Sequence, residues 1–278
     1  MVQTNMKTTR VKPAVSTLTR LEVLRREQLS PRFVRVTLGG GDIGAFTPMG
    51  FDQWFRLFIP TGDPDVLDRM PARLDTKSYL RYLTMSRSTR PVLRNYTVRA
   101  FREEGPDGPE LDVDLVVHGS AADGTAGPAS TWALTCHRGD RVAIIDEGVM
   151  FNPSWADEQV LLVADESAVP AAAGILASLP ADAVGEAVLE VPTEGDRLPL
   201  ERPEGVRLTW IVRSDPSERP GAAAFAEASL RPVPDGPVVA WVAGEQSLPT
   251  GMRREWVRGG IPKDRILFCG YWKAGHAH

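Results

Sequence analysis

Residues 94–99 read Arg-Asn-Tyr-Thr-Val-Arg, at the end of a basic stretch and within a run that predicts a β-strand over residues 93–101. Alternation along a strand sends Arg94, Tyr96 and Val98 to one face and the residues between them to the other. The motif therefore sets an aromatic ring beside a cation. Such a short motif also arises by chance, as a tyrosine in a barrel wall with surface arginines, so its surroundings decide its meaning.

The first half of the chain is predicted to be a β domain with one short inserted helix. Short β-like runs alternate with turn residues, the pattern of an antiparallel barrel or sandwich. The predicted strands cover residues 19–25, 33–38, 54–59, 93–101, 111–117 and 141–145. Residues 127–134 predict a short helix, because proline suits a first helical turn and small residues let backbone amides point outward. The polar, basic stretch over residues 60–92 is too long for an idle connection, so we expect it to be functional or mobile.

The sequence pattern changes after Asn152-Pro153. Strand-like runs over residues 160–164, 186–191, 207–212, 238–243 and 265–268 alternate with helical runs over residues 168–179, 221–230 and 246–258. Short links between strands and helices indicate a parallel sheet covered on both faces, with right-handed crossovers. We therefore predict an antiparallel β-barrel domain over residues 1–150 and a doubly wound α/β domain over residues 151–278.

Composition excludes several classes of protein. The 278 residues, 42% hydrophobic and 24% charged, are those of an ordinary globular protein. The apolar runs fall far short of the roughly 18 residues that a membrane span requires, and the amino end lacks the apolar core of a secretion signal, so we expect a cytoplasmic protein. Two distant cysteines, Cys136 and Cys269, cannot hold an iron–sulfur cluster. The four histidines show no zinc-binding spacing, and we predict no built-in metal centre.

Charge is distributed unevenly along the chain. Residues 1–150 carry 20 Lys/Arg and 18 Asp/Glu, a net charge of +2, whereas residues 151–278 carry 12 and 18, a net charge of −6. Residues 69–102 hold nine basic residues and one acid, Asp75. This stretch is either a solvated loop or a source of positive potential for an anionic cofactor or substrate. A nucleic-acid partner is not expected, because the whole chain is acidic and no binding motif interleaves aromatics with these charges.

A barrel, a helix with a small-residue amino end and a nucleotide-type α/β domain are together the parts of a ferredoxin-reductase-like flavoenzyme. Six stretches in order resemble the siderophore-interacting protein family of FAD-dependent ferric-siderophore reductases. They are residues 94–99 (RNYTVR), 111–119 (LDVDLVVHG), 127–133 (GPASTWA), 165–170 (DESAVP), 241–245 (WVAGE) and 270–275 (GYWKAG). The resemblance covers nearly the whole chain, and six motifs in sequence are far more specific than one.

The resemblance implies where FAD binds. An aromatic ring packs on the isoalloxazine, a neighbouring hydroxyl bonds its polar edge, and arginine with a helix amino end holds the pyrophosphate. The implied FAD contacts are Arg94, Tyr96, Thr97, Val98, Arg99, His118, Gly119, Gly127, Pro128, Ala129, Ser130 and Trp132. For His118 a satisfied strand-end histidine, and for Trp132 plain packing of helix on barrel, remain alternatives. The loop Ser120–Ala126 is longer than is usual in the family.

Further cofactor contacts are expected in the second half. Asp165, Glu166 and Ser167 follow the first parallel strand, at the edge where open α/β sheets bind ligands, and there could meet nicotinamide or flavin. No Gly-x-Gly-x-x-Gly follows that strand, so the expectation of NADH or NADPH rests on the resemblance. Arg213 ends another strand and is either a contact for the 2′-phosphate of NADPH or a surface arginine. For the ferric siderophore, often an anionic chelate, the candidate cations are Arg56, Arg138, Arg141 and Lys273.

The function implied by the resemblance is reduction of ferric siderophores. We expect hydride transfer from NADH or NADPH to FAD, then single-electron transfer to Fe(III), which releases iron because siderophores hold Fe(II) less tightly. The flavin carries the redox chemistry, and no side chain acts as a nucleophile. A ferredoxin is an alternative electron donor. Two other functions stay open, namely a general flavin or quinone reductase and a siderophore-binding protein without redox activity.

Overall fold

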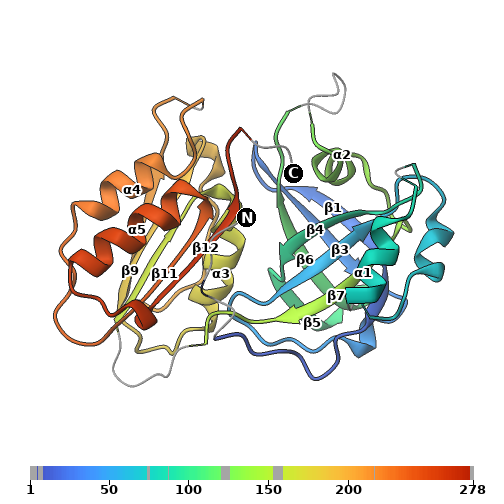
Figure 1. Cartoon of the computed structure of the whole chain (residues 1–278), viewed down its shortest axis with the longest axis horizontal. Helices are drawn as coiled ribbons and strands as arrows, with labels where there is room; N and C mark the ends of the chain where they lie inside the picture. Colours follow the sequence, from blue (N-terminus) through green and yellow to red (C-terminus); the bar gives the residue numbers. More distant parts are fainter. Residues whose placement is uncertain are drawn as a thin grey trace. The chain divides into compact units, whose positions relative to one another are not determined.

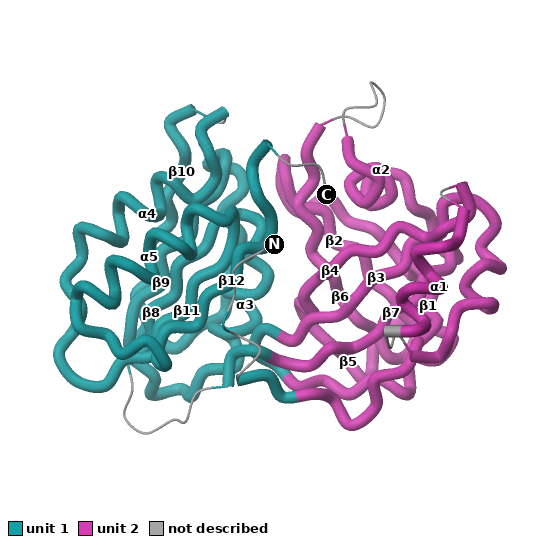
Figure 2. The backbone as a smooth tube through the Cα atoms, viewed as in Figure 1, with its two compact units in different colours: residues 1–11, 50–52, 150–278 teal, residues 12–49, 53–149 magenta. Residues whose placement is uncertain are grey.

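The computed structural model describes residues 5, 9–73, 76–86, 88–119, 126–152, 159–215 and 217–275 (Figure 1). The chain divides into two compact units (Figure 2). The barrel unit comprises Lys12–Met49 and Gln53–Val149. The α/β unit comprises Met1–Val11, Gly50–Asp52 and Met150–His278, so two short segments of the first 150 residues cluster with the second unit.

The barrel unit is an antiparallel sheet of seven strands, in the order β4-β3-β7-β1-β2-β6-β5. Its strands are β1 (Leu18–Gln28), β2 (Phe33–Gly39), β3 (Trp54–Ile59), β4 (Val92–Thr97), β5 (Ala100–Gly105), β6 (Gly108–Val116) and β7 (Arg141–Gly148). The helix α2 (Pro128–Thr135) precedes β7. The predicted strand and helix positions are confirmed here, except that the predicted strand over residues 93–101 is two strands.

Two residues between β4 and β5 curl this sheet into a barrel. β4 pairs with β3 at one edge, whereas β5 pairs with β6 at the other. The amide of Val98 donates to the Gln53 carbonyl beside β3, and the amide of Arg99 donates to the Asp112 carbonyl in β6. Because consecutive residues bond to the two opposite ends of the sheet, the sheet curls and its two edge strands are drawn toward each other.

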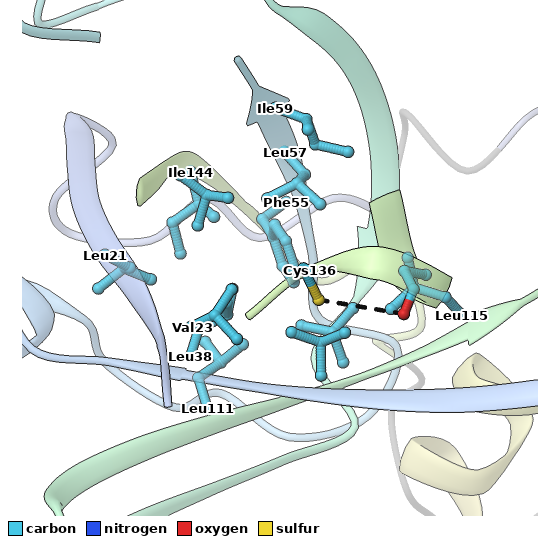
Figure 3. Close-up of a cluster of buried hydrophobic side chains, with 14 of the residues drawn as sticks. Leu21, Val23, Leu38, Phe55, Leu57, Ile59, Leu111, Leu115, Cys136 and Ile144 are labelled. Atoms are coloured by element: carbon cyan, nitrogen blue, oxygen red, sulfur yellow. Dashed lines mark hydrogen bonds between the residues drawn. The ribbon is translucent and has the colours of Figure 1, made fainter. Parts of the chain in front are cut away.

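Inward-facing side chains of the strands fill the barrel. Alternation in β6 places Leu111, Val113 and Leu115 in this core, together with Phe55 and Leu57 of β3. Figure 3 shows the cluster, which also takes in Cys136 at the end of α2, whose thiol lies near the Ala133 carbonyl. Burial raises the pKa of Cys136 to about 11, so the thiol stays protonated and packs as a small apolar side chain.

The basic stretch between β3 and β4 folds over the outer face of the sheet. It forms the 3₁₀ helix η3 (Pro64–Arg69) and the helix α1 (Thr76–Leu83). Val66, Leu67 and Tyr82 from these elements pack with Phe58 of β3 in a second, smaller apolar cluster. The stretch is therefore largely structured, although it buries few side chains.

The α/β unit is a parallel sheet in the order β10-β9-β8-β11-β12. Its strands are β8 (Gln159–Ala164), β9 (Gly185–Val191), β10 (Val206–Val212), β11 (Val238–Glu245) and β12 (Ile266–Trp272), and its helices are α3 (Val169–Ser178), α4 (Ala222–Ser229) and α5 (Ser247–Arg258). One face packs against α4 and α5 through Val163, Ala224 and Met252, while α3 contacts β8. Figure 1 shows α3 on the face away from α4 and α5, as the predicted doubly wound fold requires.

Candidate functional site

The register of β4 separates the predicted flavin residues onto two faces. Arg94 lies opposite Leu57 and Tyr96 opposite Phe55, two residues of the barrel core. Thr97 lies opposite Trp54, on the other face. Directly paired residues of an antiparallel sheet share a face, so the predicted alternation is confirmed for residues 94–97. Arg94 and Tyr96 therefore stand together, and Thr97 is turned away from them.

Tyr96 offers a partly buried, neutral phenol. Its ring packs against the barrel core, as does the ring of Trp132 from α2. Loss of solvent raises the pKa of Tyr96 to about 12, against a weaker opposing effect of Arg94. The hydroxyl is therefore protonated at neutral pH, and the residue presents an apolar ring with a polar tip.

The amino end of α2 has the features of an anion site. Gly127 is its N-cap and Pro128 its first residue, and among the described residues no side chain caps this end. The first hydrogen bond inside the helix joins the Thr131 amide to the Gly127 carbonyl, so the amides of Ala129 and Ser130 have no partner within the helix. No described atom lies within 4 Å of where a Cβ on Gly127 would be. Two amides that have no partner within the helix, next to a glycine, fit a diphosphate.

The end of β6 lies near the same elements. Both β6 and β4 contact α2, and they contact each other. His118 and Gly119 follow β6 and are exposed. Gly119 has a φ of +72°, in the left-handed region that favours glycine, so a side chain there would strain the turn. The structure thus brings β4, the end of β6 and α2 together, whereas residues 120–125 of the long loop lie outside the described residues.

Arg99 faces a ladder of carboxylates on the outside of β6. Three alternate residues, Glu110, Asp112 and Asp114, are buried beneath arginines from neighbouring strands. Arg99 lies 3.6 Å from Asp114, which Arg35 contacts at 2.7 Å. Hydrogen bonds from Arg25 and Arg102 lower the pKa of Glu110 to about 2. Arg99 thus shares a charge network that holds β6 to its neighbours.

Three of the four predicted substrate cations are engaged in ion pairs. Arg56 contacts Glu147 at 2.7 Å, and Arg138 contacts Asp107 at 2.7 Å. Arg141 contacts two aspartates of η3 at 3.0 and 2.6 Å. Arg56 pairs in register with Ile145, four residues after Arg141 on β7, which separates the two arginines by about 13 Å along the strand. The structure therefore does not bring Arg138 and Arg141 to Arg56. Lys273, in the α/β unit, is exposed.

In the α/β unit, Asp165 is fully buried at the carboxyl end of β8. One carboxylate oxygen accepts from the amide and the hydroxyl of Ser167, and the other accepts from the Glu245 amide. A Cβ on Gly244 would lie 2.4 Å from this carboxylate, so only glycine fits there. Burial, and then the nearby Glu166, raise the pKa of Asp165 to about 7. Asp165 thus ties the end of β8 to the end of β11, and Ser167 in turn accepts from the Trp272 indole at 3.2 Å.

Arg213 does not fit either of its two predicted roles. Its side chain is 3% exposed and makes two hydrogen bonds of 2.7 Å to Glu166 and one of 2.8 Å to Glu190. A guanidinium enclosed by two carboxylates cannot reach a 2′-phosphate, nor is it a surface arginine. Glu166 is likewise committed to this network rather than facing a ligand. The sequence did not reveal this network, because its three charges follow or lie on different strands, β8, β9 and β10, and meet only when the sheet has folded.

Two buried carboxylates at this edge of the sheet were given no role by the sequence. Glu190 is fully buried and also accepts from the amides of Gly221 and Ala224 at the start of α4, each at 2.8 Å. Glu245 accepts from the amides of Ser247 and Ala274, which holds the segment around Lys273. A carboxylate inside the apolar run 187–191 was the available signal for Glu190, because a buried strand tolerates a charge only with partners.

Over the described ranges, no cluster of three or more His, Cys, Asp or Glu side chains is arranged to hold a metal ion. No helix in this part of the chain has both the length and the apolar character needed to cross a membrane.

Comparison with protein families gives two adjoining matches. Residues 22–150 match the siderophore-interacting FAD-binding domain, and residues 157–275 match the siderophore-interacting protein family. The ferric vibriobactin reductase ViuB of Vibrio cholerae is 33% identical over 264 residues, covering 92% of this chain and 89% of ViuB. An NADPH-dependent ferric-chelate reductase of Escherichia coli is 27% identical, covering 91% of this chain and 92% of its own.

Solved structures agree on the fold. A siderophore utilization protein from T. fusca superposes with a TM-score of 0.76 and 29% identity, over 96% of this chain and 97% of its own. The ferredoxin reductase in carbazole 1,9a-dioxygenase superposes with a TM-score of 0.64 over 93% of this chain and 71% of its own, at 15% identity. The fold is thus ferredoxin-reductase-like, as predicted.

Proposed function

Since the chain belongs to the siderophore-interacting protein family, we propose that it is a ferric-siderophore reductase that moves electrons from NAD(P)H through FAD to Fe(III). The observation that carries this proposal is the meeting of β4, the end of β6 and the uncapped end of α2 on a chain 33% identical to ViuB. In this proposal the barrel unit is the flavin domain and the α/β unit is the nicotinamide domain. Reduction in the cytoplasm is part of the same proposal.

In this proposal the barrel residues bind and orient FAD. Tyr96 packs its ring on the isoalloxazine, and its high pKa keeps the hydroxyl a hydrogen-bond donor across the physiological range. Thr97 offers a second hydroxyl on the opposite face of β4, and the amides of Ala129 and Ser130 with Arg94 hold the diphosphate. Val98 and Arg99 support this site by curling the sheet into a barrel. His118 and Gly119 support it in the turn after β6, and Trp132 by packing on the barrel core. Bound FAD supplies hydride acceptance and single-electron transfer.

The α/β unit would present its carboxyl edge to the nicotinamide. Asp165 and Glu166 act there as positioning residues, because both are held within the protein. The Ser167 hydroxyl, bonded to Asp165 and Trp272, is the side chain of this group that would meet nicotinamide or flavin. The proposal covers NADH and NADPH alike, and a ferredoxin remains an alternative donor.

The ferric siderophore would be attracted by cations rather than enclosed in an apolar slot. Arg56 and Lys273 are the favoured candidates. Arg141 lies about 13 Å from the position of Arg56 along β7, and Arg138 lies three residues before Arg141 in the chain. An anionic chelate would have to compete with Glu147 for Arg56. The iron is substrate, and no protein ligand for it is required.

The test is a visible spectrum of the purified protein under anaerobic conditions, taken before and after addition of NADH or NADPH, and again after a ferric siderophore with a ferrous-iron trap. A flavin spectrum that bleaches with nicotinamide and returns as the ferrous complex forms supports the proposal. Bleaching without a response to the chelate indicates a general flavin or quinone reductase. A colourless protein that cannot be loaded with FAD but binds ferric siderophore indicates a carrier and overturns the proposal.

A further inference from the structure

Helix α1 presents an exposed apolar strip that the reductase function does not use. Tyr79, Leu80 and Leu83 are 40, 57 and 43% exposed. Across the described residues eight large apolar side chains are at least 37% exposed, and three of them lie on this eight-residue helix. Scattered exposed hydrophobics are ordinary, but three on two turns of one helix form a patch. We call these three residues the α1 strip.

The helix is anchored by one buried side chain. Tyr82 donates from its hydroxyl to the Pro91 carbonyl at 2.8 Å and packs edge-on against Phe58 of β3, with ring centroids 6.1 Å apart. The ring of Tyr79 stacks on that of Tyr82. Because this anchor fixes the rotation of α1, the strip is held toward solvent rather than free to turn inward.

Cations border the strip along its length. At about 100° per residue, the α1 strip spans an arc of about 100° around the helix, and Lys77 and Arg81 occupy the adjoining arc. Both cations are exposed, as is Arg73 before the helix. The helix contains no acidic residue, and residues 69–102 contain one. The surface is therefore amphipathic and positively charged.

We propose that α1 docks the protein on an anionic lipid bilayer. The α1 strip would enter the boundary between headgroups and acyl chains, while Lys77 and Arg81 would extend their long stems to lipid phosphates. Positive charge next to an apolar strip matches a negatively charged membrane surface.

The experiment is co-sedimentation of the full chain with vesicles of phosphatidylcholine alone or mixed equally with phosphatidylglycerol. We expect binding to the anionic vesicles only, falling as NaCl rises from 50 to 500 mM. The double variant Leu80→Gln/Leu83→Gln should lower the partition coefficient at least tenfold. Its control is Leu230→Gln, which alters a leucine 82% exposed at the end of α4 and should have no effect.

A charge variant tests the same surface independently. Lys77→Gln/Arg81→Gln should weaken binding by about 25-fold, since each cation near an anionic surface contributes about fivefold, whereas Arg258→Gln on α5 should not. Flavin content and thermal melting verify that each variant folds. Absence of binding to anionic vesicles, equal binding to neutral vesicles, or binding that both α1 variants retain would overturn the proposal. So would sedimentation velocity showing a wild-type dimer that Leu80→Gln/Leu83→Gln converts to a monomer, because the strip would then be a self-association surface.

Discussion

Replacement of Glu190 by alanine should destabilise the α/β unit strongly. The carboxylate is fully buried and makes three hydrogen bonds of 2.8 Å, one from Arg213 and two from the amides of Gly221 and Ala224. Arg213 keeps Glu166, so the loss at the ion pair is about 2 kcal/mol, less than the roughly 3 to 5 kcal/mol for breaking a buried pair outright. Each buried amide left without a partner costs about 1 to 2 kcal/mol. The sum is about 4 to 6 kcal/mol.

Thermal melting followed by circular dichroism measures this effect. At roughly 2 to 4 °C per kcal/mol for a unit of this size, Glu190→Ala should lower the Tm by about 10 to 20 °C. The control is Glu186→Ala on the same strand. Glu186 also pairs with two arginines but is 29% exposed, so its loss should cost under about 1 kcal/mol. If both variants melted within about 3 °C of the wild type, Arg213 would not be held in a structural network. The conclusion that Arg213 is unable to bind a ligand would then be refuted.

Three further predictions address the cofactor site and pH. Gly127→Asp should stabilise α2 by only about 0.3 kcal/mol as an N-cap yet weaken FAD binding at least tenfold by filling the anion site. A flavin titration beside a melting curve measures both effects, and an unchanged affinity for FAD would contradict the prediction. Tyr96→Ser with Thr97→Ala should release FAD, whereas Tyr96→Phe should retain most of it, and equal FAD occupancy in the double variant would show the assignment to be wrong. The pKa of Asp165, about 7 in the folded protein, exceeds its ordinary value of 3.8, so folding takes up a proton between these values. Its stabilising contribution is full below pH 4 and is lost as pH rises through 7. The free energy of unfolding should therefore fall between pH 6 and pH 8, by at most about 1.4 kcal/mol per pH unit, and the Tm should fall with it. Asp165→Asn should flatten this pH dependence, and a Tm that rises over this range would contradict the shift.

Local patterns predicted most of the fold because each strand and helix has its own apolar periodicity. The alternation in β6 and the apolar runs of β8 and β11 are visible without any knowledge of their partners. The division of residues 93–101 into β4 and β5 was not predictable in this way, because it depends on Gln53 and Asp112 at opposite edges of the sheet. Helix α1 lacked a signal because it buries little more than Tyr82.

Charge partners were the least predictable part of the site. Arg213 looked like a ligand contact because its place at a strand end is visible in the sequence, whereas its partners Glu166 and Glu190 lie 47 and 23 residues away. The same holds for Arg141, whose aspartates in η3 lie more than 70 residues away. Side-chain pairing across the folded sheet decides which cations are left to face a ligand. The apolar periodicity of a single strand does not reveal this pairing.

The most direct test of the proposed reductase is a single-turnover measurement. The FAD-loaded protein is reduced with one equivalent of NADH or NADPH without oxygen, and the reduced protein is mixed with excess ferric siderophore and a ferrous trap. Two Fe(II) per FAD, formed as the flavin absorbance returns, is the predicted result, because a two-electron donor must reduce two ferric ions. A flavin that stays bleached in the presence of the ferric chelate would contradict the central claim.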